Sequence, residues 1–462
     1  MTTRSWFRTL SLAGAFALTN LGPVQAQTGL TIYNDGRVLV RRTLPEALSA
    51  GVSNHRFSLG LLDPNSVFAL DSGVTLVGSS YDASVDEENT MRRAVGTTLK
   101  FLTGRSSNGV DDTASAVVLG VSPERFRLKD GRVTFQRPGQ PLYPAELVLA
   151  DPTLSLAVRS PNPMAALRLG YFTSGAAWNA NYTVVLGKST ARVSGLASIA
   201  SGSLRVTDAD IQLLAGSVGR ANAPRQEMLM KSMDAARASN GALADGPAQE
   251  QGIGEAHLYT IPGKISLEPG VTTGVALFEP ASAPWDRSYV VRGQIPYYGM
   301  MPQYGNDESV VPVEVWYTLK RAAKTPFGDL PLPMGSYRLY QGDDAGRLQL
   351  IGESSAGHTA PGRDVRLSAG SAFDLTAKRI QTTYATRRDS TRTIATADFK
   401  VTITSAKDTA VTVEVIEERY GEWAVITSSL PAEKVSSTRT RFRVRVPAMG
   451  EATLTYRVRV VW

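Results

Sequence analysis

The sequence contains no cysteine among its 462 residues. This absence excludes disulfides, thiolate metal sites and a lipid-modified N-terminal cysteine, although an oxidising compartment would permit disulfides. Stability must therefore come from apolar packing, and 42% of the residues are hydrophobic. Because a chain of this length exceeds what one core usually organises, we expect roughly two to four domains.

Long apolar runs are also scarce, and the one near the N-terminus has the form of a secretory signal. Arg4 and Arg8 precede an apolar stretch over residues 10–21, and the run Val24-Gln25-Ala26 follows it. This order of charged, apolar and small residues predicts a signal peptide over residues 1–26. No second stretch approaches the roughly 18 apolar residues of a spanning helix. We therefore expect an exported protein, periplasmic or extracellular, with no transmembrane span after cleavage.

The chain has only a small net charge and few histidines. The formal net charge is +7, and removal of the signal lowers it by two. Such a mildly basic balance on an exported chain predicts no nucleic-acid partner. The three histidines, His55, His257 and His358, stand without the closely spaced partners of a metal site. No Gly-rich phosphate loop is present, so we assign no cofactor, no metal site and no catalytic residue.

Two patterns come near to catalytic motifs. The run Gly352-Glu353-Ser354-Ser355-Ala356 is one residue short of a nucleophile elbow and leads into a loop where that motif needs a helix. Adjacent carboxylates at 111–112, 343–344 and 417–418 point to opposite sides of an extended chain, which does not suit a glycosidase pair. We expect turn or surface roles for them.

Alternation of apolar and polar residues recurs through most of the chain and predicts short strands separated by turns. The fold class is therefore all-β, with several antiparallel sandwich or barrel modules. We expect an N-terminal module over residues 27–92, a small module over 93–150 and a sandwich region over 151–462. The predicted strands lie at 38–40, 74–77, 99–102, 116–119, 147–149, 154–158, 182–186, 313–319, 337–340, 348–351, 399–403 and 411–416.

The segment over residues 221–254 breaks this pattern, because it is rich in Ala, Gln, Asn, Ser and Gly. We expect a mobile, partly helical insertion with a short helix at 226–238. Met228, Met230 and Met233 could let that helix dock a partner, but their spacing does not make a regular stripe.

The end of the chain predicts a hairpin. Arginines alternate with Phe442, Val444 and Val446 over residues 439–446, and residues 454–462 alternate in the same way with Trp462 inward. The arginine row could bind an anionic polymer. The favoured interpretation is a solvated face that Glu414 and Glu418 balance from a neighbouring strand.

Several further segments form a recognisable set: residues 169–182, 210–216, 332–335 with 338–340, 350–353, 370–374 and 454–458. Together they resemble a bacterial exported family known as domain of unknown function 4139, which includes mucoidy inhibitor A-like proteins. The resemblance covers about residues 154–462 and implies a signal peptide, an all-β body and a cell-envelope location, with no established activity. We expect core roles for Trp178 and Tyr182, which share one face of a strand, and for Phe373.

Aromatic residues crowd a Gly- and Pro-containing stretch over residues 285–306, which we predict to be a loop. Ring faces among Gln and Asn suit glycan stacking or a protein interface. The alternative is a hairpin tip folded over its own domain. The candidate ligand-binding residues are Trp285, Tyr289, Tyr297, Tyr298 and Tyr304.

Together these features favour a noncatalytic interaction or scaffold protein of the cell envelope that binds glycan or protein partners. The alternative is a hydrolase that acts on envelope polymers with an acidic or Ser-centred site. An enzyme would bring polar residues with shifted pKa values together in a pocket, whereas a binding module would present an exposed patch. The sequence predicts no oligomeric state.

Overall fold

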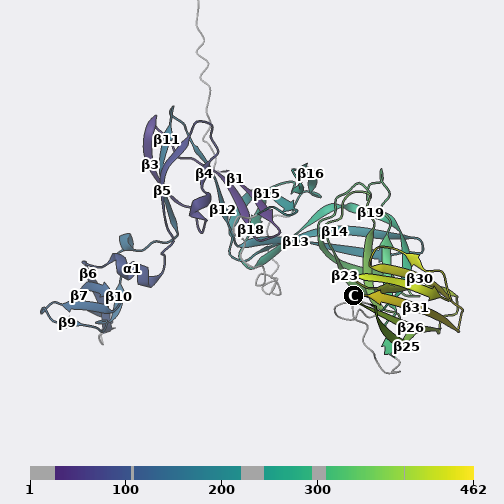
Figure 1. Cartoon of the computed structure of the whole chain (residues 1–462). Coiled ribbons are helices and arrows are strands. Elements are labelled where there is room, and N and C mark those ends of the chain that lie inside the picture. Colours follow the sequence, from purple (N-terminus) through teal and green to yellow (C-terminus); the bar gives the residue numbers. More distant parts are fainter. Residues whose placement is uncertain (1–26, 106–108, 220–243, 294–308, 390) are drawn as a thin grey trace, which may run out of the picture. The chain divides into compact units, whose positions relative to one another are not determined.

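The computed structural model describes residues 27–105, 109–219, 244–293, 309–389 and 391–462. The fold is all-β and multi-module, as predicted: apart from one short α-helix and two 3-10 turns, the regular elements are strands (Figure 1). The predicted signal peptide and residues 221–243 of the predicted insertion lie outside the described residues. The end of that insertion, at Gln249–Ile253, forms strand β16, so the prediction of a loop there is wrong.

Contacts divide the chain into two units. The first holds residues 27–31, Arg37–Ser174 and Asp208–Asp210, and the second holds Ile32–Gly36, Gly175–Thr207 and Ile211–Trp462. Residues 151–174, which we expected in the sandwich region, therefore belong to the first unit. The reason is non-local pairing, because β11 (Thr153–Ser160) lies between β3 (Gly51–Ser58) and β5 (Thr75–Asp82).

The first unit also contains a second set of paired strands. Strand β12 pairs with β2 along seven residues and with β4 at its other edge. Leu167, Leu169 and Tyr171 of β12 are buried, so this strand supplies part of the core. The elements are β1 (Gln27–Tyr33), β2 (Val38–Leu44), β12 (Leu167–Thr173), β4 (Phe68–Ala69) and the turn η1 (Pro64–Ser66).

Residues 87–147 form a small module with a core of its own. Helix α1 (Glu87–Arg93) begins at Asp86, whose carboxylate accepts a hydrogen bond from the Asn89 amide, and it packs Met91 against the sheet. The Phe101 and Phe126 rings meet edge to face at 5.3 Å. The strands, in sheet order, are β10 (Gln140–Leu142), β6 (Thr98–Arg105), β7 (Asp111–Val121), β8 (Glu124–Leu128) and β9 (Val133–Thr134).

One predicted strand of this module does not form. Residues 145–147 make the 3-10 turn η2 (Ala145–Leu147), and the chain after it continues without a ladder. Leu147 packs against the module core from that turn. An apolar run of three residues fits a turn that covers a core edge as well as it fits a strand.

The second unit is built on a ten-stranded sheet. Strand β19 (Val271–Arg292) runs through 22 residues, and it pairs with β14 in its first part and with β21 and β27 in its second. The remaining strands are β13 (Ala176–Leu186), β14 (Thr190–Ser201), β21 (Glu314–Leu319), β22 (Gly335–Gly342), β23 (Leu348–Ala356), β24 (Val365–Ser371), β27 (Val411–Glu418), β29 (Glu433–Lys434) and β30 (Arg439–Val446). Shorter strands of this unit are β15 (Val206–Ala215), β16, β17 (Ala256–Thr260) and β18 (Ile265–Leu267).

The core roles predicted for Trp178 and Tyr182 are confirmed. Both side chains are buried, and the Tyr182 ring stacks on Tyr337 at 4.2 Å while its hydroxyl donates to the Pro333 carbonyl. Gly335 starts β22 where that strand runs parallel to β13, and a Cβ there would lie 2.2 Å from the Ala180 carbonyl oxygen. Only glycine permits this approach of the two strands.

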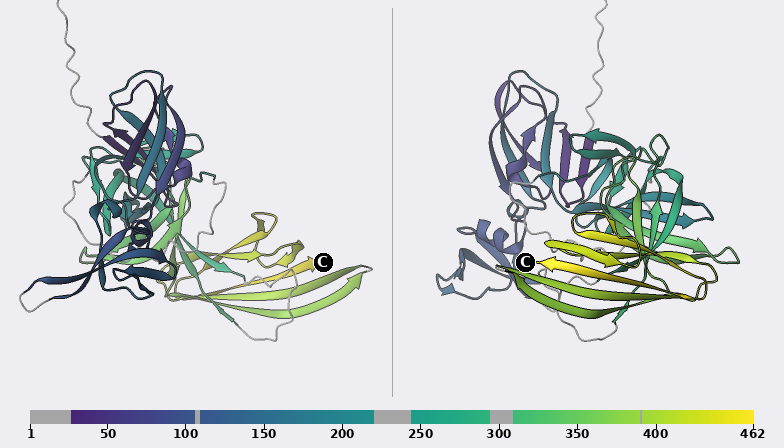
Figure 2. Two further views of the ribbon diagram at one scale, coloured as in Figure 1. Left: turned by 90° about the vertical axis from the view of Figure 1, so that its left-hand side faces the viewer. Right: turned by 45° about the vertical axis from the view of Figure 1, so that its right-hand side comes forward.

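A five-stranded sheet closes the C-terminal sandwich (Figure 2). Its inner face packs against β19, β27 and β30 around one apolar core that includes Phe399, Phe442 and Tyr456. Both sheets therefore alternate apolar inward and polar outward residues. The strands, in order, are β20 (Ser309–Val311), β25 (Leu375–Asp389), β26 (Arg392–Ser405), β31 (Glu451–Val461) and β28 (Glu422–Ser428).

The predicted C-terminal hairpin is wrong. Strand β30 pairs with β27 and β29, whereas β31 pairs with β26 and β28, so the chain crosses from one sheet to the other after Val446. The inward residues of both strands enter the same core, which is why the alternation matched a hairpin. Phe442, Val444 and Val446 are buried as predicted, but Trp462 is 41% exposed.

Phe373 does not have the core role that we expected. It is 96% exposed in the turn between β24 and β25, while Gly370 has a φ of +82° near the end of β24, where the pairing with β21 shifts register. Glycine adopts this conformation without the strain of a Cβ. The backbone at Gly370, and not a buried ring, therefore accounts for the pattern of residues 370–374.

Candidate functional site

The structure does not bring the predicted aromatic residues together as an exposed loop. Trp285 and Tyr289 lie within β19, so the loop prediction is wrong for residues 285–292. Tyr289 is buried in the sandwich core. Trp285 donates a hydrogen bond to the Gly187 carbonyl, and its ring lies 5.5 Å from Tyr317. Tyr289 therefore serves packing, and Trp285 is held against its own sheet while partly exposed. The candidates Tyr297, Tyr298 and Tyr304 lie outside the described residues.

An open groove of about 530 Å³ lies on the outer face of the five-stranded sheet. It crosses β25, β26, β31 and β28, whose outward residues are mainly hydroxyl-bearing or charged. We call it the sheet groove. Its lining consists of Thr382, Asp398, Phe399, Lys400, Thr427, Ser428, Ser429, Thr455, Tyr456 and Arg457.

Two β-bulges border the sheet groove. The register between β25 and β26 shifts between Gln381 and Thr383, and that between β28 and β31 shifts between Val425 and Thr427. A bulge bends its strand and increases the local twist. The two bulged strands lie on either side of the regular pair β26 and β31, so the outer face is hollowed along that pair.

An ion pair fixes the polar floor of the groove. The Asp398 carboxylate accepts hydrogen bonds from Arg457 Nε at 2.6 Å and Arg457 Nη2 at 2.8 Å. The Thr383 hydroxyl donates to the same carboxylate at 2.5 Å. The Arg457 hydrogen bonds hold the pKa of Asp398 below its usual range, and the Thr383 hydroxyl acts in the same direction. Asp398 is therefore an ionised, firmly oriented acceptor.

Other groups of the groove keep hydrogen-bonding capacity. Ser428 and Ser429 already bond to the Leu430 carbonyl and the Thr455 amide, respectively. In contrast, no hydrogen bond or ion pair joins the side chains of Thr427, Thr455 or Lys400 to another residue of the described chain. Two hydroxyls and one ammonium are thus available to a ligand beside the Asp398–Arg457 pair.

A second polar cluster lies inside the sandwich, where its carboxylate is shielded from solvent. Glu417 is fully buried and forms ion pairs with Arg419 at 2.6 Å and Arg379 at 3.2 Å. The Tyr456 hydroxyl donates to Glu417 at 2.7 Å. The Arg379 guanidinium also covers the Phe399 ring at 3.9 Å. This cluster holds the two sheets together and does not open to a ligand.

The surface role predicted for Glu417 is therefore wrong, although that for Glu418 holds. Glu418 pairs with Arg439 at the surface, as predicted, and Glu414 pairs with Arg441. Glu417 continues the inward series of Val413 and Val415 along β27. The alternation of that strand was the signal that could have placed this carboxylate in the core.

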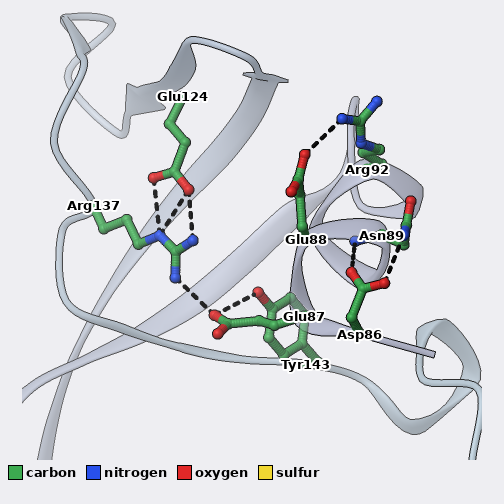
Figure 3. Close-up of polar contacts among 8 residues, drawn as sticks. All are labelled: Asp86, Glu87, Glu88, Asn89, Arg92, Glu124, Arg137 and Tyr143. Atoms are coloured by element: carbon green, nitrogen blue, oxygen red, sulfur yellow. Dashed lines mark hydrogen bonds and ion pairs between the residues drawn. The ribbon is translucent and has the colours of Figure 1, made fainter. Parts of the chain in front are cut away.

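The small module has its own polar cluster, drawn in Figure 3. Arg137 binds Glu124 through Nε and Nη2 and Glu87 through Nη1. The Tyr143 hydroxyl donates to the same Glu87 at 3.2 Å. Burial and the adjacent Glu87 charge raise the pKa of Tyr143 to about 12. These contacts tie the segment after β9 to helix α1, so the cluster is a structural clamp.

The histidines make separate local contacts. His55 bonds Ser53 and Glu46, His257 bonds Glu250, and His358 accepts from the Met334 amide. Within the described residues, no group of three or more His, Asp or Glu side chains is placed to hold a metal ion. None of the helices in the described ranges is long and apolar enough to cross a membrane.

Comparisons with known proteins identify no family for this chain. A scan against protein-family models found no match, and a search of curated proteins found none either. The resemblance to the domain of unknown function 4139 family therefore stays a prediction.

Proposed function

We propose that this chain is an exported cell-envelope protein that acts by binding rather than by catalysis, with a saccharide as ligand of the sheet groove. The observation that carries the proposal is the groove itself. It is an open depression on a paired sheet, and it offers the hydroxyls of Thr427 and Thr455, the Lys400 ammonium and the Asp398–Arg457 pair. Saccharides present many hydroxyls, each of which can donate and accept hydrogen bonds, and this lining matches them.

The state of Asp398 favours binding over hydrolysis. A general acid must hold a proton near neutral pH, which requires a raised pKa. The Arg457 hydrogen bonds lower the pKa of Asp398, so its carboxylate remains an acceptor for ligand hydroxyls. The hydrolase alternative therefore has no support in the geometry of this groove.

Titration of the mature protein with dextran oligosaccharides tests the groove. The double variant T427V/T455V removes two hydroxyls and keeps side-chain shape, and we expect about tenfold weaker binding from two lost hydrogen bonds. Thr453→Val is the matched control, because Thr453 lies on the outer face of β31 but does not line the groove. Hydrogen exchange should show protection of residues 398–400 and 453–458 on binding. Equal affinity of the double variant and the control contradicts this site.

Export is the second part of the proposal. The charged, apolar and small residues of the first 26 positions support cleavage after Ala26. Intact-mass measurement on protein from the native host should give a chain that begins at Gln27. A cytoplasmic species that retains Met1 contradicts the envelope location.

A further inference from the structure

The other outer face of the C-terminal sandwich carries alternating arginines and glutamates. It is formed by β24, β21, β19, β27 and β30, which are neighbours in that order. We call it the arginine face. Its charged residues are Arg292, Arg366, Arg439, Arg441, Arg443 and Arg445 with Glu314, Glu414, Glu418 and Glu433.

Most arginines of this face have a carboxylate partner. Arg292 pairs with Glu314 at 3.1 Å, and Arg439 pairs with Glu418 at 3.1 Å. Arg441 lies between two glutamates, and Arg443 shares one of them. The arginine–carboxylate pair is thus the repeated unit of this surface.

Arg366 departs from the pattern. Its guanidinium lies 4.7 Å from the centre of the Trp316 ring, and no hydrogen bond or ion pair joins it to another residue in the described ranges. Trp316 is itself fixed, because its Nε1 donates to Glu314 at 2.8 Å. Although the residue is exposed, partial desolvation by its neighbours lowers the pKa of Arg366; Glu414 opposes this shift and Arg292 adds to it. Arg366 is a positioned cation whose donors are not used.

We propose that Arg366, held on Trp316, binds the carboxylate of an acidic polysaccharide. A guanidinium matches a carboxylate through two parallel hydrogen bonds in one plane. Stacking on the indole orients the guanidinium before the ligand arrives, which reduces the entropy lost on binding. At Arg366, a ligand carboxylate takes the position that glutamate carboxylates take beside the neighbouring arginines. The sheet groove lies on the opposite sheet of the sandwich, so this site does not depend on the proposed saccharide site.

The test is a calorimetric titration of the mature protein with polygalacturonate, in parallel with dextran. Arg366→Gln removes the guanidinium from an exposed position. We expect about tenfold weaker binding of polygalacturonate, because a charged hydrogen-bonded pair is lost. Arg445→Gln is the matched control. Arg445 lies on the same face without an ion pair or aromatic ring contact among the described residues. Its loss should change affinity by less than about twofold, because salt screens an exposed charge.

Several outcomes separate this site from its alternatives. Dextran binding should be the same in Arg366→Gln and wild type, and polygalacturonate binding should survive the groove variant T427V/T455V. Equal weakening by Arg366→Gln and Arg445→Gln means diffuse electrostatic attraction and overturns the proposal. Tighter binding of polyphosphate than of polygalacturonate overturns the carboxylate assignment, as does the absence of polygalacturonate binding by wild type. The melting temperature of Arg366→Gln should match wild type, which shows that the fold is intact.

Discussion

The small module and the C-terminal sandwich both combine an arginine, a glutamate and a tyrosine, but at different depths. In the small module, Arg137 and Tyr143 meet Glu87 at the surface, where the Glu87 side chain is 57% exposed. In the sandwich, Arg379 and Tyr456 meet a Glu417 that is fully buried. Both clusters join a glutamate to a guanidinium and a tyrosine hydroxyl, so they can be compared at two levels of burial.

Burial makes the sandwich cluster costly to break. The charges of a surface ion pair are hydrated whether or not they are paired, so the pair contributes little to the free energy of unfolding. A buried charge that loses its partner cannot regain water. The sandwich cluster also has two cations for one carboxylate, because Arg419 joins Arg379. Glu417 is therefore the residue on which this part of the core depends most.

The largest expected effect comes from Glu417→Gln. The substitution leaves Arg379 and Arg419 buried without a carboxylate, and we expect the free energy of unfolding to fall by about 3–5 kcal/mol. Chemical denaturation of the full chain measures it. Glu418→Gln is the control at the next position, where the partly exposed pair with Arg439 should contribute about 0–1 kcal/mol. Equal losses for the two variants contradict the contrast between buried and exposed pairs.

Removing the tyrosine hydroxyl should affect stability less, and differently in the two clusters. Tyr456→Phe keeps the ring in the core but removes the hydroxyl that donates to Glu417, and we expect a loss of about 1–3 kcal/mol because the buried carboxylate loses one of its charge-assisted hydrogen bonds. Tyr143→Phe removes the matching hydroxyl from a solvated Glu87, which water can replace. Its effect should stay below about 0.5 kcal/mol. If Tyr143→Phe proves the more harmful change, depth does not determine the value of these contacts.

The alternation of residues predicted most strands of both regions, but it could not predict strand partners. Residues 439–446 and 454–460 alternate as a hairpin would, yet each strand pairs in a different sheet. Their partners, β27 and β26, come from earlier in the chain, and no local pattern encodes that choice.

The sites were harder to predict than the strands for related reasons. The sheet groove depends on two bulges, which add a residue without changing composition. Tyr289 looked like part of an aromatic loop, but β19 continues past it and carries the ring into the core. Arg366 and Trp316 lie 50 positions apart in the sequence and meet only because β21 pairs with β24.

Alkaline titration sharpens the comparison at the surface cluster. The pKa of Tyr143 is raised from 10.0 to about 12, so the folded state holds the proton more tightly than the unfolded chain. Its contribution to stability is full below pH 10 and is lost as the pH rises from 10 to about 12. Ultraviolet absorbance of tyrosinate should show a late-ionising ring that disappears in Tyr143→Phe. Identical tyrosine titration curves for wild type and Tyr143→Phe would contradict this prediction.

The smallest effect concerns acid. Hydrogen bonds from Arg137 hold the pKa of Glu124 below its usual value of 4.5. A lowered carboxyl pKa stabilises the fold above the unfolded value and loses that contribution as the pH falls through the folded one. Arg137→Gln should therefore reduce stability by less than about 1 kcal/mol at pH 7, because the Arg137 side chain is about one third exposed and solvent screens the pair. Below pH 4.5 the difference between Arg137→Gln and wild type should shrink, since protonated Glu124 no longer needs the guanidinium. Denaturation at pH 7 and pH 3 measures both values, and a difference that grows with acidity would show that Arg137 acts through packing and not through charge.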